Sequence, residues 1–249
     1  MAARNVMKNL RVKDYVSAGD LRTDIQSSKR YFLEENFAQA PLLNAAIGVE
    51  ANLNFEVLGE NMTSALSTFC TTRGGIRMTT AGADDDQSIL LPHLDTKQTA
   101  WTNVKWGTEN QTVWESTITT GDDVATGLLI WAGLKLTNTP VIATDANQVF
   151  FRFSTDDSDT EFVCESSIAG VDTATDSGVT VEASTEYKLK IKIDEDRKAQ
   201  FYINDELITT TAALTNDIDL IPYIGIQALS ATAEFIEVHN EKISRLIYE

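Results

Sequence analysis

Carboxylates that share one face of a strand are the residues of this sequence with the most obvious chemistry. Glu161 and Glu165 lie four residues apart in a strand-like segment, so both point to one face while Phe162 and Cys164 point to the other. Two carboxyl groups about 5–10 Å apart can cleave a glycosidic bond. No apolar surroundings are visible that would separate the pKa values of this pair. We therefore expect surface acids and no catalytic residue.

Nucleophilic and cofactor chemistry find equally little support. Cys70 and Cys164 lie in apolar strand-like patterns, and His93 and His239 are far apart in sequence. There is no Gly-x-Ser-x-Gly elbow and no phosphate-loop pattern. The cysteines lack zinc-knuckle spacing, and without a visible secretory signal they are interpreted as buried free thiols. We expect a protein that is not an enzyme and that carries no cofactor.

Calcium is the one metal that the sequence leaves open. Two loops each carry several carboxylates, the hard oxygen ligands that Ca²⁺ prefers. Asp-rich loops also form turns without any metal, and no EF-hand spacing is present, so a metal-free loop is the more ordinary interpretation. The candidate calcium ligands are Asp84, Asp85, Asp86, Asp156, Asp157 and Asp159.

Tryptophan could serve carbohydrate binding, because an exposed indole stacks on a sugar ring. Trp101 and Trp106 are five residues apart, so on one regular strand they point to opposite faces and one of them is open to solvent unless another subunit covers it. These two are the candidate glycan-stacking residues. Burial in the core is the commoner use of tryptophan and is the alternative.

The elements that must position these residues are β-strands. From Glu186 to Asp194, four apolar residues alternate with three lysines, which is the pattern of a half-buried antiparallel strand. A turn at Asp194–Arg197, a second strand and a tight turn at Asn204–Asp205 follow. The segment predicts a three-stranded meander.

Further short strands are expected along the chain, separated by Asp-, Asn-, Thr- and Gly-rich loops such as 172–178. Their number favours an all-β fold, a two-sheet antiparallel jelly-roll sandwich. The expected strands are 53–58, 75–80, 88–91, 101–106, 112–119, 126–136, 148–154, 161–165, 223–228 and 233–244.

The N-terminal segment differs from this body. Residues 1–30 hold seven Lys/Arg and three Asp, and a short helix capped by Ser17 or Asp20 is expected to run to about Tyr31. We therefore divide the chain into an arm with a docking helix, residues 1–35, and a β-sandwich domain, residues 36–249. The basic residues expected to bind a partner are Arg4, Lys8, Arg11, Lys13, Arg22, Lys29 and Arg30.

Charge restricts the choice of partner. The remaining 219 residues hold thirteen Lys/Arg and thirty-four Asp/Glu, and such an acidic body repels nucleic acid. No apolar run reaches the roughly 20 residues needed to span a bilayer. A basic arm ahead of an acidic body suggests docking on an acidic surface, such as a neighbouring copy, and the alternative is a frayed tail on an acidic, soluble body.

The segment Lys198–Ile208 resembles the strand–turn–strand element of concanavalin A-like (laminin-G-like) jelly rolls, with Asp205 at the usual glycine position. The resemblance implies that fold over about residues 50–245. Glucanases of the fold carry a Glu-x-Asp-x-Glu strand, which this sequence lacks. The resemblance thus supports the fold and argues against a glucanase.

Three segments, Gly82–Asp95, Ala132–Asn138 and Asp145–Phe153, are similar in style to structural proteins of tailed bacteriophages. This similarity implies a capsid decoration (cement) protein that self-associates as a homo-oligomer. It would dock on the major capsid protein or another virion protein and reside in the virion, assembled in the host cytoplasm. The alternative is a lectin-like, carbohydrate-binding module of a phage fibre or receptor-binding protein.

Overall fold

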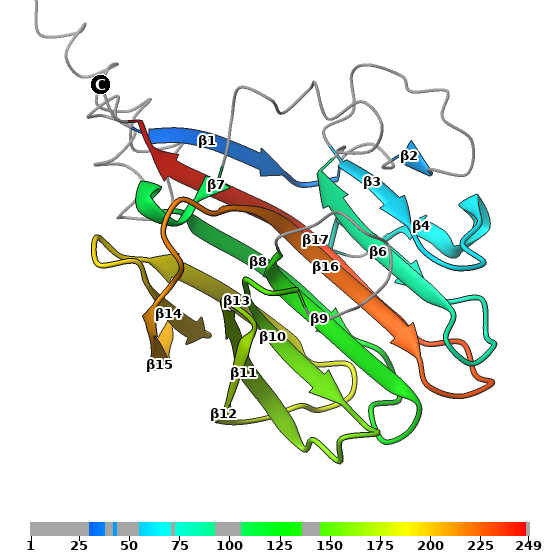
Figure 1. The fold of residues 1–249 in the computed structure, drawn as a ribbon. Helices are drawn as coiled ribbons and strands as arrows, with labels where there is room; N and C mark the ends of the chain where they lie inside the picture. Colours follow the sequence, from blue (N-terminus) through cyan, green and yellow to red (C-terminus); the bar gives the residue numbers. More distant parts are fainter. Residues whose placement is uncertain are drawn as a thin grey trace, which may run out of the picture.

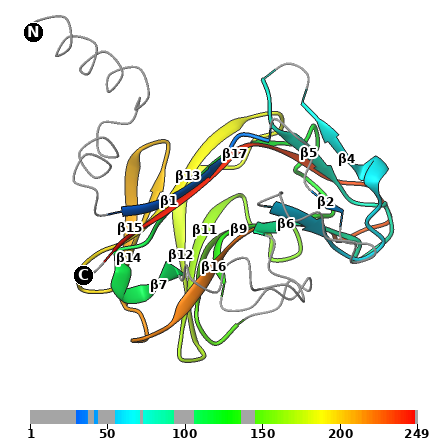
Figure 2. The ribbon, with the colours of Figure 1, turned by 90° about the horizontal axis from the view of Figure 1, so that it is seen from above.

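The computed structural model describes residues 30–37, 42–43, 55–70, 73–92, 106–135 and 145–247. Over these residues the chain forms two largely antiparallel sheets packed face to face (Figure 1). The view from above shows the two layers, with β13 and β17 in one and β16 and β9 in the other (Figure 2). The predicted all-β two-sheet sandwich is confirmed. No helix in the described part of the chain is long and apolar enough to cross a bilayer.

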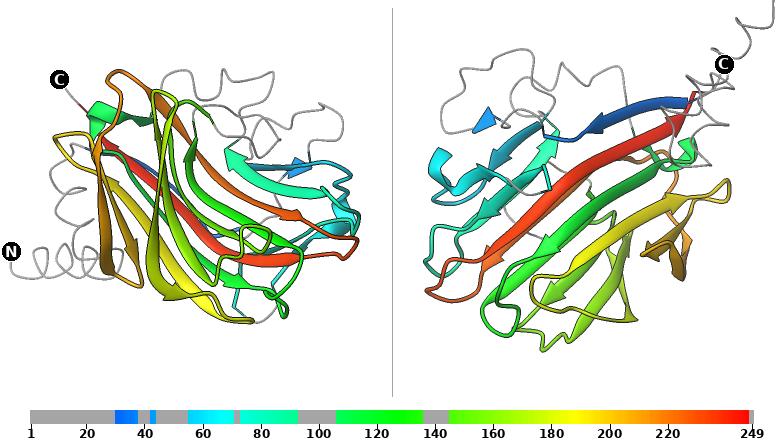
Figure 3. Two further views of the ribbon diagram at one scale, coloured as in Figure 1. Left: turned by 60° about the horizontal axis from the view of Figure 1, so that its bottom comes forward. Right: turned by 180° about the vertical axis from the view of Figure 1, so that it is seen from behind.

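Sheet A has the strand order β15-β14-β13-β8-β17-β5-β4, and β1 also pairs with β17. It occupies the front when the molecule is seen from behind (Figure 3, right). Its strands are β1 (Arg30–Glu35), β4 (Ser67–Phe69), β5 (Ile76–Thr79), β8 (Val113–Thr120), β13 (Glu186–Ile193), β14 (Lys198–Ile203), β15 (Glu206–Ala213) and β17 (Phe235–Leu246).

Sheet B has the order β12-β11-β10-β9-β16-β6-β3-β2, and β7 pairs with the start of β16. The β2–β3 pair is parallel. The strands are β2 (Leu42–Leu43), β3 (Phe55–Leu58), β6 (Gln87–Pro92), β7 (Trp106–Gly107), β9 (Leu128–Lys135), β10 (Gln148–Ser154), β11 (Glu161–Ile168), β12 (Val171–Thr180) and β16 (Asp219–Ala228), and two short 3₁₀ turns are η1 (Ser64–Leu66) and η3 (Thr108–Asn110).

Alternating residues of both sheets fill the space between them. In β13 the four apolar residues are buried and the three lysines lie on the outer face, as the alternation predicts. Phe151 of β10 meets Phe201 of β14 edge-on, with ring centroids 5.1 Å apart, and so joins the sheets. Burying such a side chain contributes about 1.5–3 kcal/mol.

The predicted meander is confirmed as β13, β14 and β15. Its tight turn places Asn204 and Asp205 at φ of 52° and 69°. A two-residue hairpin with both φ values positive matches the twist of the strands, and Asn and Asp tolerate this conformation better than most residues. Asp205 therefore replaces the usual glycine there.

The first strand corrects the expected boundary of the arm. Residues Arg30–Glu35 pair with Glu241–Leu246 of β17, so they belong to sheet A and not to a helix or a separate arm. Leu33 is buried in the common core. Residues 1–29, including the rest of the predicted helix, lie outside the described residues.

A second correction concerns residues 172–178, which were expected to form a loop. They lie within β12, the edge strand of sheet B. Nearly every β12 residue is exposed on both faces, so the segment lacks the apolar alternation by which a strand is recognised. Of the expected strand 101–106, only Trp106 is described, as the first residue of β7.

A bulge in β17 turns Glu241 into the core. The register against β8 shifts between Val238 and Asn240, so Glu241, which simple alternation from Glu237 would place outside, points between the sheets. The carboxyl group is fully buried and accepts a hydrogen bond from Trp114 Nε1 at 3.0 Å. Burial raises the pKa of Glu241 to about 8.

Candidate functional site

The outer face of sheet B, which points away from sheet A, carries a group of buried aromatic and polar side chains. Alternation along three adjacent strands places Trp131 and Lys135 of β9, Gln148 and Phe150 of β10, and Tyr223 of β16 on this face. The three aromatic residues, together with Ile89 and Leu91 of β6, form a hydrophobic cluster separate from the core between the sheets. We call the five residues the aromatic–lysine cluster.

The rings of the cluster are held in a defined arrangement. Trp131 stacks on Phe150, with centroids 4.6 Å apart and an interplanar angle of 28°. The Tyr223 ring leans along its strand over Gly225, where a Cβ would lie 2.9 Å from Tyr223 Cε1. Glycine at 225 therefore makes room for the ring.

A lysine ammonium lies against these rings. Lys135 Nζ is 4.6 Å from the centroid of Tyr223 and 5.6 Å from that of Trp131, within cation–π range. Lys135 is 1% exposed, and burial lowers its pKa, an effect opposed by Asp145, whose Oδ2 lies 3.8 Å away. Burial also raises the pKa of Tyr223. The cluster thus combines aromatic surface with one costly buried cation.

Four buried polar atoms of the cluster have no hydrogen-bond partner. They are Trp131 Nε1, the Tyr223 hydroxyl, and both the Oε1 and Nε2 atoms of Gln148. Buried polar groups are almost always bonded, and each one left without a partner costs about 1–3 kcal/mol. Donors and acceptors on adjacent strands of one face are therefore available to a ligand that carries both.

An ion-pair network borders the cluster. Arg152 lies opposite Trp131 in the β9–β10 register and contacts three carboxylates. Its guanidinium meets Glu165, Asp159 at 3.2 Å and Asp157 at 3.4 Å. Burial raises the pKa of Glu165, and the charge of Arg152 opposes this shift. We call these four residues the Arg152 network.

The Arg152 network accounts for one of the two predicted calcium loops. Asp157 and Asp159 face a guanidinium, and Asp159 also accepts a hydrogen bond from the Ser154 amide at 2.9 Å. Asp156 is exposed. Asp157 and Asp159, two of the calcium candidates, are therefore paired with an arginine side chain.

The other calcium loop is a turn closed by its own residues. Asp86 is buried and accepts hydrogen bonds from the Ala83 amide and Asn61 Nδ2, both at 2.6 Å. Asp85 accepts one from a side chain of β16, and Asp84 is exposed. The buried Asp86, one of the calcium candidates, thus closes a turn. In the part of the chain that the structure describes, no three His, Cys, Asp or Glu residues gather where they could hold a metal ion.

The structure places Trp106, a predicted stacking residue, in the core between the sheets and not on an outer face. Trp106 is 4% exposed and packs against Tyr31 of β1, with ring centroids 5.8 Å apart, because β7 lies along β16 inside the sandwich. Trp101 lies outside the described residues. Among the described tryptophans, Trp131 is the one on the outer face of sheet B.

Arg30 is the one described member of the predicted partner-binding arm, and it is fixed within the sandwich. Its Nη2 donates to the Gln111 carbonyl at 2.7 Å and its Nε donates to Ser244 Oγ at 3.2 Å. The side chain therefore holds β1 to neighbouring elements and is not a free contact residue. The other predicted arm residues, Arg4, Lys8, Arg11, Lys13, Arg22 and Lys29, lie outside the described residues.

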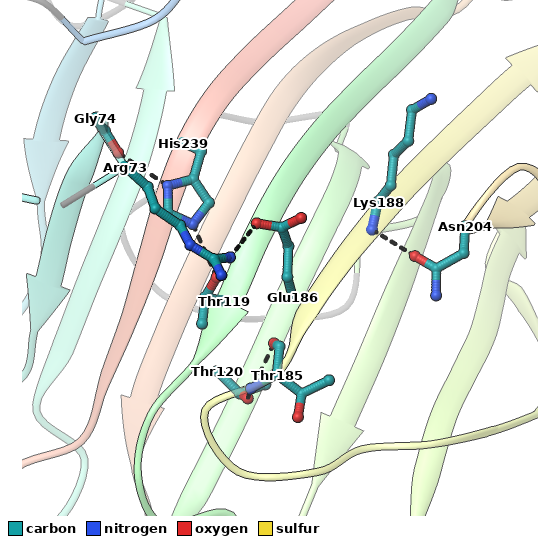
Figure 4. A network of polar contacts seen from close by, with 9 residues as sticks. All are labelled: Arg73, Gly74, Thr119, Thr120, Thr185, Glu186, Lys188, Asn204 and His239. Carbon is teal, nitrogen blue, oxygen red and sulfur yellow. Dashed lines mark hydrogen bonds and ion pairs between the residues drawn. The ribbon is translucent and has the colours of Figure 1, made fainter.

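A second polar network lies on the outer face of sheet A (Figure 4). His239 Nδ1 donates to the Gly74 carbonyl at 2.9 Å, and Nε2 of the neutral ring accepts from the Thr119 hydroxyl at 2.8 Å. Arg73 pairs with Glu186 at 2.6 Å on the same face. Both nitrogens of His239 are engaged, so the network holds the turn before β5 against the sheet. The two cysteines are free thiols, with Cys164 buried and Cys70 half-buried.

Sequence reasoning did not single out Lys135, Gln148 or Tyr223. For Lys135 the signal was its position as the last residue of the apolar strand Leu128–Lys135. Such a strand is buried on both faces, so a lysine at its end has no solvated side to occupy. For Tyr223 the signal was Gly225, because a glycine within a strand often marks a place where another group lies close to the backbone.

Comparison with known proteins identifies the fold. No protein-family description and no curated protein sequence matches the chain. Similar solved structures include a protein of unknown function from Shewanella oneidensis (TM-score 0.61, 13% identity, 88% of this chain and 87% of that one), a Bacillus licheniformis β-glucanase (0.56, 10%, 88% and 98%) and peanut lectin (0.54, 10%, 89% and 100%). At these identities the likeness shows the concanavalin A-like jelly-roll fold alone.

Proposed function

We propose that this protein binds a carbohydrate on the outer face of sheet B, through the aromatic–lysine cluster, and does not cleave it. The observation that carries the proposal is the set of four buried polar atoms without hydrogen-bond partners on three adjacent strands. A structural core needs no polar atoms there, whereas a binding site tolerates their cost because the ligand satisfies them.

The chemistry of the cluster suits a sugar. A pyranose presents C–H groups on its faces and hydroxyl groups around its edge. The first can pack on aromatic rings such as Trp131 and Tyr223. The hydroxyl groups can both donate and accept hydrogen bonds, as Gln148 and the Tyr223 hydroxyl require. That solved lectins and glucanases share the fold is consistent with this proposal.

The accessible part of the site lies toward β12. The rings of the cluster are at most 7% exposed, whereas Asp157 and Asp172 are exposed on the same side of sheet B. We propose that the sugar approaches the rings over these residues.

Non-enzymatic binding is supported by the state of the nearby acids. Glycosidases need one carboxylic acid and one carboxylate free to act on opposite sides of the sugar bond. In the Arg152 network, Glu165, Asp157 and Asp159 all contact one guanidinium. We propose that these acids position Arg152 and bind hydroxyl groups.

A glycan array followed by titration of the best glycan tests the proposal. Binding with a dissociation constant in the micromolar to millimolar range, and an intact glycan after prolonged incubation, is the expected result. An array without any binder contradicts the carbohydrate proposal, and release of shortened sugars contradicts its non-enzymatic part.

The interpretation as a capsid decoration protein in the virion, docked through its N-terminal arm, stays a prediction. The residues proposed to make that contact lie outside the described part of the chain, except for Arg30, which is bound within the sandwich. The alternative to it, a carbohydrate-binding module of a phage fibre or receptor-binding protein, agrees with the carbohydrate proposal and also stays a prediction.

A further inference from the structure

The strands next to the aromatic–lysine cluster are strongly acidic. Residues 145–180, which form β10, β11 and β12 with their turns, contain eight Asp/Glu and a single basic residue, Arg152. Lys135 is the cation nearest to them on β9, and Asp145 lies beside it. A ligand that reaches the cluster from the β12 side therefore passes through a region of negative potential.

The register brings several of these acids onto the outer face of sheet B. Glu165 lies opposite Phe150 of the cluster, and Asp172 and Asp176 of β12 lie opposite Ser167 and Val163, residues that share the face of Glu165. The negative charge of Asp172 acts on Glu165 strongly enough to help raise its pKa. Glu165, Asp172 and Asp176 thus lie on the same outer face of sheet B as the rings.

A single guanidinium does not neutralise this surface. Arg152 already contacts three carboxylates and can offer little to a further anion. An ionised carboxylate can only accept hydrogen bonds, so Asp172 and Asp176 offer two exposed acceptors, suited to a ligand that brings O–H or N–H donors. A uronate or sulfate group in this place would meet like charges, because Arg152 already contacts three carboxylates and Lys135 is buried beside Asp145.

We infer that the ligand is a neutral glycan, whose hydroxyl groups donate to the carboxylates of β11 and β12 while one sugar ring packs on Trp131 and Tyr223. The site excludes polyuronates and sulfated glycans. This inference rests on the proposed carbohydrate-binding function and adds the class of sugar to it.

Matched oligosaccharide pairs test the inference. Each neutral hexose oligomer is compared with the counterpart of the same linkage that carries a carboxylate in place of the C6 hydroxymethyl group. The neutral member of the best pair is expected to bind at least ten-fold more tightly at low salt, and the ratio should shrink as salt screens the acids. A uronate member that binds as tightly as the neutral one overturns the inference but leaves carbohydrate binding in place. Binding of neither member overturns both.

Charge substitution on β12 provides a second test of the inference. Asp172→Lys/Asp176→Lys is expected to raise the affinity for the uronate member relative to the neutral member at least ten-fold, because both side chains are exposed and lie outside the core. The control, Glu195→Lys/Glu206→Lys, makes the same change in net charge at an exposed position of the β13–β14 turn and one of β15, and should leave the ratio unchanged. An equal change in both variants would show a non-specific effect of net charge and overturn the assignment to this face.

Discussion

Replacing Glu241 by glutamine is expected to remove most of the loss of stability that the protein undergoes between about pH 4.5 and pH 8. Burial raises the pKa of Glu241 from 4.5 to about 8 in the folded protein. Between these values the folded protein keeps a proton that the unfolded chain has released. The free energy of unfolding then falls as pH rises, by up to about 1.4 kcal/mol per pH unit.

The limits of this pH window follow from the same linkage. Below pH 4.5 both states are protonated and the stability is fully present, whereas above pH 8 both are ionised and the loss is complete. Glutamine is a neutral isostere that can still accept the hydrogen bond from Trp114 Nε1. The pKa of Glu234 is raised to about 7, mainly by burial. Glu234 therefore also lowers the free energy of unfolding as pH rises, and this contribution persists in the variant.

Urea unfolding at several pH values measures this effect. Glu241→Gln should show a clearly flatter pH dependence than the unmodified protein and a higher stability at pH 8. The control is Glu237→Gln on the same strand, whose side chain pairs with Arg77 on the outer face of sheet A. Identical slopes for Glu241→Gln and the unmodified protein would mean that the carboxyl group is not buried in the folded state.

Removing the polar atoms of the cluster is expected to stabilise the protein and to weaken binding. Tyr223→Phe deletes a buried hydroxyl without a partner and should raise the free energy of unfolding by about 1 kcal/mol. Gln148→Leu, similar in volume, deletes two such atoms and should raise it by about 1–3 kcal/mol. Each variant should weaken binding of the best array glycan at least ten-fold, because the site loses groups that bond hydroxyls.

Tyr187→Phe is the matched control for Tyr223→Phe. Tyr187 is also buried, but its hydroxyl donates to the Thr180 carbonyl at 2.9 Å and accepts from the Glu182 amide at 2.8 Å. This variant should lose about 1–2 kcal/mol of stability and bind as before. If Tyr223→Phe lost stability in the same way, its hydroxyl would be a structural group and the proposed site would lose its main support.

The fold was largely predictable because it rests on alternation and turn chemistry. The lysine-bearing strand β13 and the turn at Asn204–Asp205 can both be recognised from the local sequence. The edge strand β12 could not be recognised, since both of its faces are solvated. The bulge in β17 could not be predicted either. One inserted residue moves every later side chain of the strand to the opposite face, so the inward direction of Glu241 was missed as well.

The candidate site was not predictable to the same degree. The sequence shows Trp131, but it does not show whether the side chain points into the core or away from it, because that depends on which side of sheet B packs on sheet A. Gln148 and Tyr223 become notable only when both are seen buried without partners on adjacent strands, which is a property of the tertiary structure. The Asp-rich loops suggested calcium because the sequence does not show that Arg152 lies between Asp157 and Asp159.

The central claim is that a glycan binds on the outer face of sheet B, and mapping its contact points tests this most directly. A photoreactive derivative of the best array glycan is cross-linked to the protein, and the labelled peptides are identified by mass spectrometry. The account expects labels in β9, β10 and β16, lost on competition with the unmodified glycan and in Gln148→Leu/Tyr223→Phe. Competed labels confined to β13, β14 or β17 of sheet A, or to residues 1–29, would contradict it.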